Sequence, residues 1–115
     1  MNAKDFANKW VQSWNSHNLD DILNHYADDI QINTPMIQMA FGEGDGTLIG
    51  KEAVSAYWSK ALEKFPDLHF ELFEVTVGVN SVALYYQSIM HKKAIEVMTF
   101  NAEGKVCKMQ ALYTE

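Results

Sequence analysis

The hydrophobic residues in the first part of the chain recur at the spacing of a helix. Between residues 3 and 14 they form one stripe, made of Ala3, Phe6, Ala7, Trp10, Val11 and Trp14. Such a stripe predicts an amphipathic helix, which Asn2 is placed to cap. A shorter stripe over residues 19–26 ends with Tyr26, and the strongest stripe covers residues 54–65, just before Pro66. We therefore expect three helices in the N-terminal part of the chain.

The rest of the pattern is typical of strands and turns. Residues 30–33 alternate apolar and polar side chains, which predicts a brief strand that Pro35 stops. Residues 36–49 contain the sequence Gly-Glu-Gly-Asp-Gly and are expected to form a mobile loop. From residue 68 onward the hydrophobic period is two, which predicts four strands, at residues 68–77, 82–90, 94–100 and 106–113. Helices followed by a meander indicate an α+β fold, and we expect residues 1–115 to form a single domain.

Composition and charge narrow the classes of function. The chain has 115 residues, of which 48% are hydrophobic and 21% charged, as in an ordinary soluble domain. A formal net charge of -6 argues against a nucleic-acid partner and against an anionic membrane surface, because both attract clustered basic residues. We see no signal peptide, and no apolar run approaches the ~20 residues of a spanning helix. The lone Cys107 excludes an internal disulfide and fits the reducing cytoplasm, where we expect the protein to be.

The predicted strand at residues 94–100 has apolar side chains on both of its faces. Ile95 and Val97 point to one side, while Met98 and Phe100 point to the other. Three short helices cannot cover both faces of a four-stranded antiparallel sheet. We therefore expect one face to hold the core or a pocket, and the outer face to form a homodimer contact.

Several local motifs resemble one protein superfamily and follow its order along nearly the whole chain. They are the segment 14–29, which includes Tyr26-Ala-Asp-Asp29, then Gly50-Lys-Glu52, Glu96-Val-Met-Thr-Phe100 and Gly104-Lys-Val-Cys-Lys-Met-Gln-Ala111. These segments resemble the nuclear transport factor 2-like superfamily, which includes ketosteroid isomerases and SnoaL-like polyketide cyclases. The resemblance implies three N-terminal helices packed on a curved, mainly antiparallel sheet that forms a cone-shaped pocket for a small molecule.

The resemblance also assigns roles to individual positions. Ketosteroid isomerases use a carboxylate base and two hydrogen-bond donors, which are a tyrosine and a protonated acid. By resemblance, Thr34 stands at the base position, Trp10 at the tyrosine position and Glu96 at the acid position. Because threonine cannot act as a carboxylate base, ketosteroid isomerase activity itself is not expected. Glu43 and Asp45, in the glycine-rich loop, are the nearby carboxylates that could replace the base.

Glu96 is the leading candidate for chemistry. SnoaL-like cyclases, which the chain resembles, use one pocket acid with neither a metal nor an organic cofactor, and Glu96 can take that part. A carboxyl group buried between apolar neighbours has a raised pKa, as proton transfer near neutral pH requires. The alternative is a structural acid that is hydrogen-bonded inside the core to Trp10, Trp58 or Tyr26.

A second set of residues consists of candidates for the wall of the pocket. They are Trp10, Trp14, Tyr26, Thr34, Tyr57, Trp58, Met98, Phe100, Met109 and Tyr113. The alternative for each aromatic residue is a place in an ordinary core without a ligand. The four histidines lack metal-binding spacing, so no metal site is expected. Asp28 and Asp29 are interpreted as structural, with Lys51 as a possible partner for the pair.

Together these observations predict a small-molecule-binding, SnoaL-like domain. Its enzymatic version is a cofactor-independent isomerase or cyclase that performs acid/base chemistry on an apolar or aromatic substrate. One rival is a non-catalytic module that binds a ligand without converting it. The other is a dimeric protein-interaction module that uses the outer face of the sheet.

Overall fold

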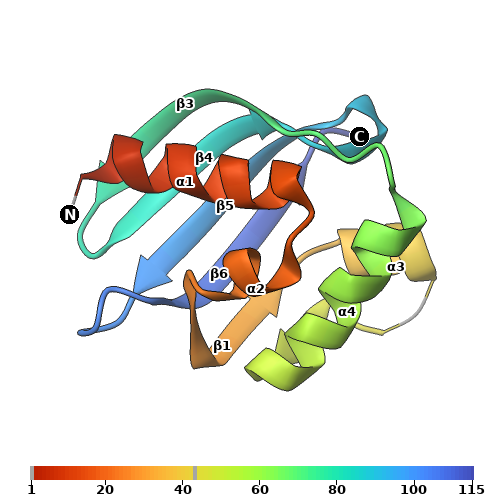
Figure 1. Ribbon diagram of the computed structural model, residues 1–115, viewed down its shortest axis with the longest axis horizontal. Coiled ribbons are helices and arrows are strands. Elements are labelled where there is room, and N and C mark those ends of the chain that lie inside the picture. Colours follow the sequence, from red (N-terminus) through yellow and green to blue (C-terminus); the bar gives the residue numbers. More distant parts are fainter. Residues whose placement is uncertain (1, 43) are drawn as a thin grey trace.

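The computed structural model describes residues 2–42 and 44–115, and in that part of the chain four α-helices pack against a six-stranded sheet (Figure 1). The helices are α1 (Ala3–Ser16), α2 (Leu19–Leu23), α3 (Met36–Phe41) and α4 (Lys51–Lys64). The strands are β1 (Tyr26–Asn33), β2 (Thr47–Ile49), β3 (Glu71–Gly78), β4 (Ser81–Gln87), β5 (Lys93–Phe100) and β6 (Val106–Tyr113). A 3-10 turn, η1 (Ile89–His91), joins β4 to β5. The expected α+β architecture, with helices packed on a curved and mainly antiparallel sheet, is confirmed, but the described residues form four helices where three were expected.

The sheet has the order β2-β1-β6-β5-β4-β3. The predicted four-strand meander forms its larger part, and all pairs within it are antiparallel. The sheet is wider than predicted because β1 adds to β6 in parallel, with Ile32 opposite Met109, and β2 adds to β1. Strands from the two ends of the sequence therefore lie side by side in the middle of the sheet.

Helix α1 forms where the hydrophobic stripe predicts it. The side chain of Asn2 accepts a hydrogen bond from the N–H of Asp5 at 3.0 Å, which satisfies one free donor of the first turn. The helix ends at His17, which has a φ of 60° and donates its N–H to the carbonyl oxygen of Trp14. Trp10 and Trp14 are buried, and Figure 1 shows α1 lying across β3, β4 and β5.

The prediction that Tyr26 belongs to the second helix is wrong. Helix α2 ends at Leu23, and Tyr26 is the first residue of β1. The carbonyl oxygen of His25 accepts a hydrogen bond from the N–H of Val106 at 2.9 Å, so the chain joins the sheet at this point. Pairing with β6 thus competes with the helical period and ends the helix early.

The prediction of a mobile loop over residues 36–49 is also wrong for the described residues. Thr34 Oγ1 accepts a hydrogen bond from the N–H of Met36 at 3.1 Å and so helps to start α3. Strand β2 then pairs with β1, with Leu48 opposite Ile32. Between α3 and β2, Gly46 has a φ of 87°, and a Cβ atom at this position would lie 3.2 Å from the carbonyl oxygen of Thr34. Glycine lets the chain turn tightly back to the sheet.

The core lies between the helices and the sheet and is rich in aromatic rings. Trp10 stacks on Phe70 with a centroid distance of 5.6 Å and meets Tyr86 edge-on at 5.1 Å. Trp14 meets Trp58 edge-on at 5.1 Å, which links α1 to α4. In the described ranges, no helix has the length and apolar character needed to cross a bilayer.

Candidate functional site

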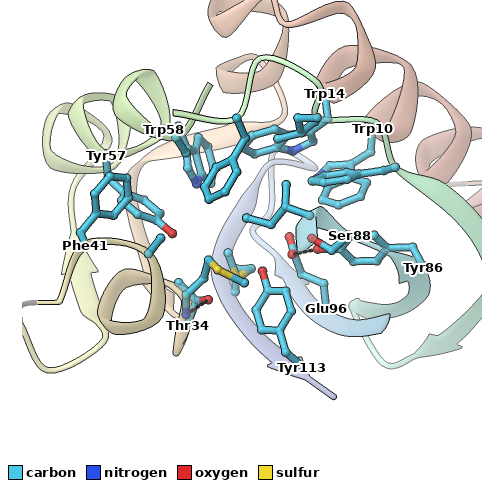
Figure 2. Close-up of a pocket in the computed structure, with 18 residues that line it drawn as sticks. Trp10, Trp14, Thr34, Phe41, Tyr57, Trp58, Tyr86, Ser88, Glu96 and Tyr113 are labelled. Atoms are coloured by element: carbon cyan, nitrogen blue, oxygen red, sulfur yellow. Dashed lines mark hydrogen bonds between the residues drawn. The ribbon is translucent and has the colours of Figure 1, made fainter. Parts of the chain in front are cut away.

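A cavity of about 50 Å³ lies between the helices and the sheet (Figure 2). Half of its wall is aromatic, contributed by Trp10, Trp14, Phe41, Tyr57, Trp58, Phe65, Phe70, Tyr86 and Tyr113. Among the described residues that line it, Glu96 is the one ionisable acid, and none is a lysine, arginine or histidine. The cavity is therefore an apolar space with one carboxyl group and several hydroxyl and indole donors.

The alternation of β5 turns Glu96 inward. Its neighbours Ile95 and Val97 are exposed on the outer face, whereas Glu96 is only 4% exposed. Glu96 Oε1 accepts a hydrogen bond from the Tyr86 hydroxyl at 2.8 Å (Figure 2). Tyr86 comes from the adjacent strand β4, where Leu84 is the direct partner of Glu96 in the register. The two strands thus place the acid and its donor side by side.

Burial controls the protonation of Glu96. Removal from water raises the pKa of this carboxyl group from 4.5 to about 7, because the charged form loses its hydration. The hydrogen bond from Tyr86 acts in the opposite direction and lowers the pKa, but its effect is smaller. Near neutral pH both forms of Glu96 are consequently populated, so the group can accept a proton or give one.

The tyrosines around Glu96 remain protonated at neutral pH. Burial, together with a smaller effect of the nearby charge of Glu96, raises the pKa of Tyr113 to about 12. Burial also raises the pKa values of Tyr86 and Tyr57 above their ordinary value, again with a contribution from Glu96. These hydroxyl groups therefore act as hydrogen-bond donors or acceptors and not as bases.

Helix α3 closes one side of the cavity. It contributes Met36, Ala40 and Phe41 to the wall. Lys64, at the end of α4, donates a hydrogen bond to the carbonyl oxygen of Ala40, and its ammonium group lies 5.1 Å from the centre of the Phe41 ring. Phe41 in turn meets Tyr57 edge-on at 5.5 Å. α3 is thus held against α4 by several contacts.

The structure brings most of the predicted site residues together. Glu96 is joined in the cavity wall by Trp10, Trp14, Thr34, Tyr57, Trp58, Met109 and Tyr113. Thr34 is buried, and its hydroxyl oxygen accepts a hydrogen bond from the N–H of Met36, so it contributes to the wall and to the start of α3.

Three residues predicted for the wall lie outside it. Tyr26 is buried behind the wall, where its hydroxyl accepts a hydrogen bond from Trp10 Nε1 at 2.8 Å. Met98 is completely buried in the core, and Phe100 packs edge-on against Phe6 with a centroid distance of 5.0 Å. Met98 and Phe100 share the inward side of β5 with Glu96, but neither belongs to the cavity wall.

Asp45, one of the two predicted loop acids, lies outside the cavity wall. Asp45 is exposed, and its carboxylate accepts a hydrogen bond from the N–H of Thr47 at 3.0 Å, which stabilises the turn before β2. The prediction for Glu43 lies outside the described residues. In the part of the chain that the structure describes, no three His, Cys, Asp or Glu side chains are arranged to hold a metal ion.

Sequence reasoning missed Tyr86, the hydrogen-bond partner of Glu96. The alternatives considered for that role, Trp10, Trp58 and Tyr26, do not bond to it; Trp10 and Tyr26 instead bond to each other. The pairing of β4 with β5 could have identified Tyr86, because Leu84 is the partner of Glu96 and Tyr86 lies on the same face of β4 as Leu84. Phe70, Ser88 and the residues of α3 were also missed as parts of the wall.

Comparison with known proteins identifies the fold and the family. The family model described as the SnoaL-like domain matches residues 7–113. A SnoaL-like protein of unknown function from Burkholderia thailandensis E264 is 44% identical, with a TM-score of 0.92, and the match covers 98% of this chain and 94% of that one. Comparison with curated proteins gives no match.

Two other solved structures share the fold at 15% identity. One, from Agrobacterium tumefaciens C58, is titled a "putative isomerase of the SnoaL-like family"; its TM-score is 0.76, with 98% of this chain and 97% of that one covered. The other is IdmH from Streptomyces antibioticus, titled a "putative polyketide cyclase"; its TM-score is 0.78, with 98% and 92% covered. The match of the family model to nearly all of the chain and the 44% identity lead to one conclusion. This chain belongs to the SnoaL-like domain family.

Proposed function

We propose that the cavity binds a small apolar or aromatic molecule and that Glu96 transfers a proton to or from it. The observation that carries this proposal is a buried carboxyl group with a pKa of about 7 in the wall of an otherwise apolar cavity. A group that is half protonated near neutral pH is suited to general acid/base catalysis. The reaction class is a cofactor-independent isomerisation or cyclisation, in which Glu96 takes a proton from carbon or oxygen and returns it elsewhere.

The surrounding donors support the same chemistry. Abstraction of a proton next to a carbonyl group creates negative charge on the carbonyl oxygen, and neutral hydrogen-bond donors stabilise that charge. Tyr57 and Tyr113 both line the cavity and keep their protons at neutral pH. The two distant neighbours, described as a "putative isomerase" and a "putative polyketide cyclase", represent this class of reaction.

Exchange of carbon-bound hydrogen tests the proposal without knowledge of the natural substrate. Acetophenone is a suitable probe, because its methyl protons are weakly acidic and exchange slowly in D2O. We expect the protein to accelerate deuterium incorporation, as measured by 1H NMR, and Glu96→Gln to reduce that acceleration by about 10²–10⁴-fold. Asp45→Asn, which changes an exposed acid outside the cavity, is the matched control and should keep the full rate.

The second candidate function is ligand binding without conversion. The described lining favours it, because Glu96 is the one carboxyl group there and no histidine, lysine or second acid accompanies it to share the proton transfer. Binding of acetophenone without faster deuterium exchange than in buffer would support this function and contradict catalysis of proton transfer by Glu96.

The outer face of the sheet supports a further proposal, a homodimer. Phe73, Tyr85, Ile95 and Leu112 are each at least 38% exposed. They form a row across the strands, since Tyr85 pairs with Ile95, Ile95 pairs with Leu112, and the rings of Phe73 and Tyr85 are 5.2 Å apart. A continuous apolar row of this kind is typical of protein interfaces. A protein-interaction module would use the same row for a different partner.

Sedimentation velocity at micromolar concentration distinguishes these uses of the outer face. We expect a dimer, and we expect Ile95→Lys to convert it to a monomer. Val79→Lys changes a side chain that is 91% exposed at the turn between β3 and β4 and should leave the dimer intact. A monomeric parent protein would contradict the homodimer and favour a different partner.

A cytoplasmic location is also proposed. Its support is the free Cys107, which is half-buried and has no disulfide in the described residues. Proteins with unpaired cysteines are common in reducing compartments. Cell fractionation with an antibody against the protein would test the location.

A further inference from the structure

One polar atom of the cavity wall is left without a partner. Among the described residues, the indole nitrogen of Trp14 is the one buried side-chain nitrogen or oxygen that makes no hydrogen bond. Trp14 is only 6% exposed, so bulk water does not hydrate this N–H group. The neighbouring Trp10 is different, because its Nε1 donates to the Tyr26 hydroxyl at 2.8 Å. Buried N–H groups in folded proteins almost always have an acceptor, so this donor requires an explanation.

The environment of Trp14 provides that explanation. Its ring forms part of the cavity wall, and in Figure 2 it lies between Trp10 and Trp58, with its nitrogen on the edge that faces the interior. Burial raises the pKa of the Tyr26 hydroxyl, and interactions with the indole groups of Trp10 and Trp14 oppose that shift. The N–H group of Trp10 donates to this oxygen at 2.8 Å, whereas the N–H group of Trp14 lies near it without completing a hydrogen bond. The N–H group is therefore available to a molecule in the cavity.

The charges around the cavity restrict the chemistry of that molecule. The described lining includes no lysine, arginine or histidine, so an anionic group would be buried without a counter-charge. The charged form of Glu96 would repel an anion as well. A cation beneath Trp14 would meet the positive end of the N–H dipole. An uncharged oxygen, such as that of a carbonyl, ester or ether group, avoids all three penalties.

We propose that the indole N–H of Trp14 recognises the ligand, and that the ligand carries an uncharged oxygen acceptor on an otherwise apolar body. This inference rests on the proposed function, because it requires that the cavity bind a small molecule. It adds a residue that positions the ligand and determines its class. Hydrogen bonding to this otherwise unpaired donor distinguishes a ketone or an ether from a hydrocarbon of the same shape.

Three probes of nearly the same shape test the inference. Acetophenone has an uncharged carbonyl oxygen, isopropylbenzene replaces that oxygen with a methyl group, and benzoate is an anion. The three tryptophans of the chain give three indole N–H signals in a 1H–15N NMR spectrum, and a Trp→Phe variant of each assigns them. We expect acetophenone to move the Trp14 indole proton downfield, isopropylbenzene to bind without that shift, and benzoate not to bind.

The variant Trp14→Phe measures the contribution of the N–H group to affinity. It keeps an aromatic ring and removes the donor. We expect the preference for acetophenone over isopropylbenzene, taken as the ratio of their Kd values, to fall by about three- to tenfold. In the control variant Tyr85→Phe the ratio should not change, because this variant removes a hydroxyl group on the outer face of the sheet, outside the cavity wall. If Trp14→Phe fails to fold, the indole shift of the parent protein decides the question.

The remaining outcomes separate this inference from the proposed function. Equal binding of acetophenone and isopropylbenzene, with no acetophenone-specific shift of the Trp14 indole proton, would overturn the inference and leave the binding function in place. Binding of neither probe would overturn both. Tighter binding of benzoate than of acetophenone would contradict the restriction to uncharged acceptors.

Discussion

At the scale of the residue, the molecule is dominated by one carboxyl group in an apolar wall. Glu96 is surrounded by aromatic and aliphatic side chains, and its hydrogen-bond partner is the uncharged Tyr86 hydroxyl. With no cation in the described lining, ionisation of Glu96 leaves an unpaired buried charge. The folded protein therefore favours the neutral acid, which couples its stability to pH.

The first prediction concerns this coupling. The folded state holds the Glu96 proton up to about pH 7, whereas the unfolded chain releases it near 4.5. Between these values the folded state binds more protons, so ionisation of Glu96 lowers the free energy of unfolding by about 3 kcal/mol as the pH rises. The free energy of unfolding of Glu96→Gln, measured relative to the parent protein by urea unfolding, should therefore be higher at pH 8 than at pH 5 by about that amount.

The control for this measurement is Glu103→Gln, which changes an exposed acid in the turn before β6. Its stability relative to the parent protein should differ much less between the two pH values. A Glu96→Gln variant whose relative stability is the same at pH 5 and pH 8 would show that Glu96 ionises with an ordinary pKa.

The identity of individual site residues was only partly predictable. The alternation of apolar and polar positions places Glu96 on an inward face, and the structure agrees. The same alternation groups Met98 and Phe100 with Glu96, yet both lie outside the cavity wall. The alternation specifies which face of the strand a side chain lies on, but not whether that part of the strand borders the cavity. The cavity covers only part of the inward face. The bond from Tyr86 depends on the register between β4 and β5, which the sequence pattern alone does not determine.

At the scale of the element, one side chain connects α1 to the start of β3. Asn15 Nδ2 donates to the carbonyl oxygen of Phe70 at 3.0 Å, and Asn15 Oδ1 accepts from the N–H of Phe70 at 2.6 Å. The amide thus pairs with the backbone as a second strand would, one residue before β3 begins. Phe70 lies in the cavity wall, so this pair of bonds also fixes part of the site.

The second prediction follows from these two bonds. Asn15→Ala removes both and leaves two backbone groups with partial access to water, so the free energy of unfolding should fall by about 2 kcal/mol. Asn15→Asp keeps the acceptor but loses the donor, and its loss should be intermediate. Urea denaturation followed by tryptophan fluorescence gives both values. Equal stability of the alanine variant and the parent protein would show that the bonds contribute nothing.

The third prediction concerns the attachment of α3 to α4. Lys64→Met removes the hydrogen bond to the carbonyl oxygen of Ala40 and the cation above the Phe41 ring. Loss of a contact worth about 0.5–1 kcal/mol should accelerate hydrogen exchange in α3 by about two- to fivefold. Lys60→Met, which changes an exposed lysine one turn earlier on α4, is the control and should leave that exchange unchanged. Unchanged exchange at Met39 and Gly42 in Lys64→Met would argue against this attachment.

The elements themselves were predicted unevenly, for physical reasons. Helix α1 and the four strands after residue 70 have long periodic patterns, and they form close to where the patterns place them. Helix α3 and strand β2 are short, and their glycine-rich surroundings are typical of loops. Their stability comes from contacts with distant partners, such as Lys64 for α3 and β1 for β2. The local pattern of hydrophobic and polar residues does not predict contacts between residues that are far apart in the sequence.

At the scale of the whole molecule, the helices cover one face of the sheet and leave the other exposed. The covered face contains the cavity, and the exposed face carries the apolar row of Phe73, Tyr85, Ile95 and Leu112. The strand β5 contributes to both, since Glu96 points inward while Ile95 points outward. A partner bound to the outer face would therefore rest on the backbone of the strand that holds Glu96.

The parallel pairing of β1 with β6 determines when the site can form during folding. Ile32 lies opposite Met109, which is 77 positions later in the sequence, and Met109 and Tyr113 of β6 belong to the cavity wall. Such distant partners make the closing step slow compared with the formation of α1 or of the hairpins. Before β6 is in place, β1 has an open edge and the aromatic wall is incomplete.

The fourth prediction follows from this order of assembly. A fragment that ends at Ala102 lacks β6, and we expect it to be digested by protease under conditions in which the full chain resists. A fragment that resists digestion like the full chain would contradict it. If the fragment is digested as expected, any chain in which β6 has not yet paired, during synthesis or refolding, exposes the tryptophans of α1 and α4. Such an incomplete chain is a substrate for chaperones and a source of aggregation.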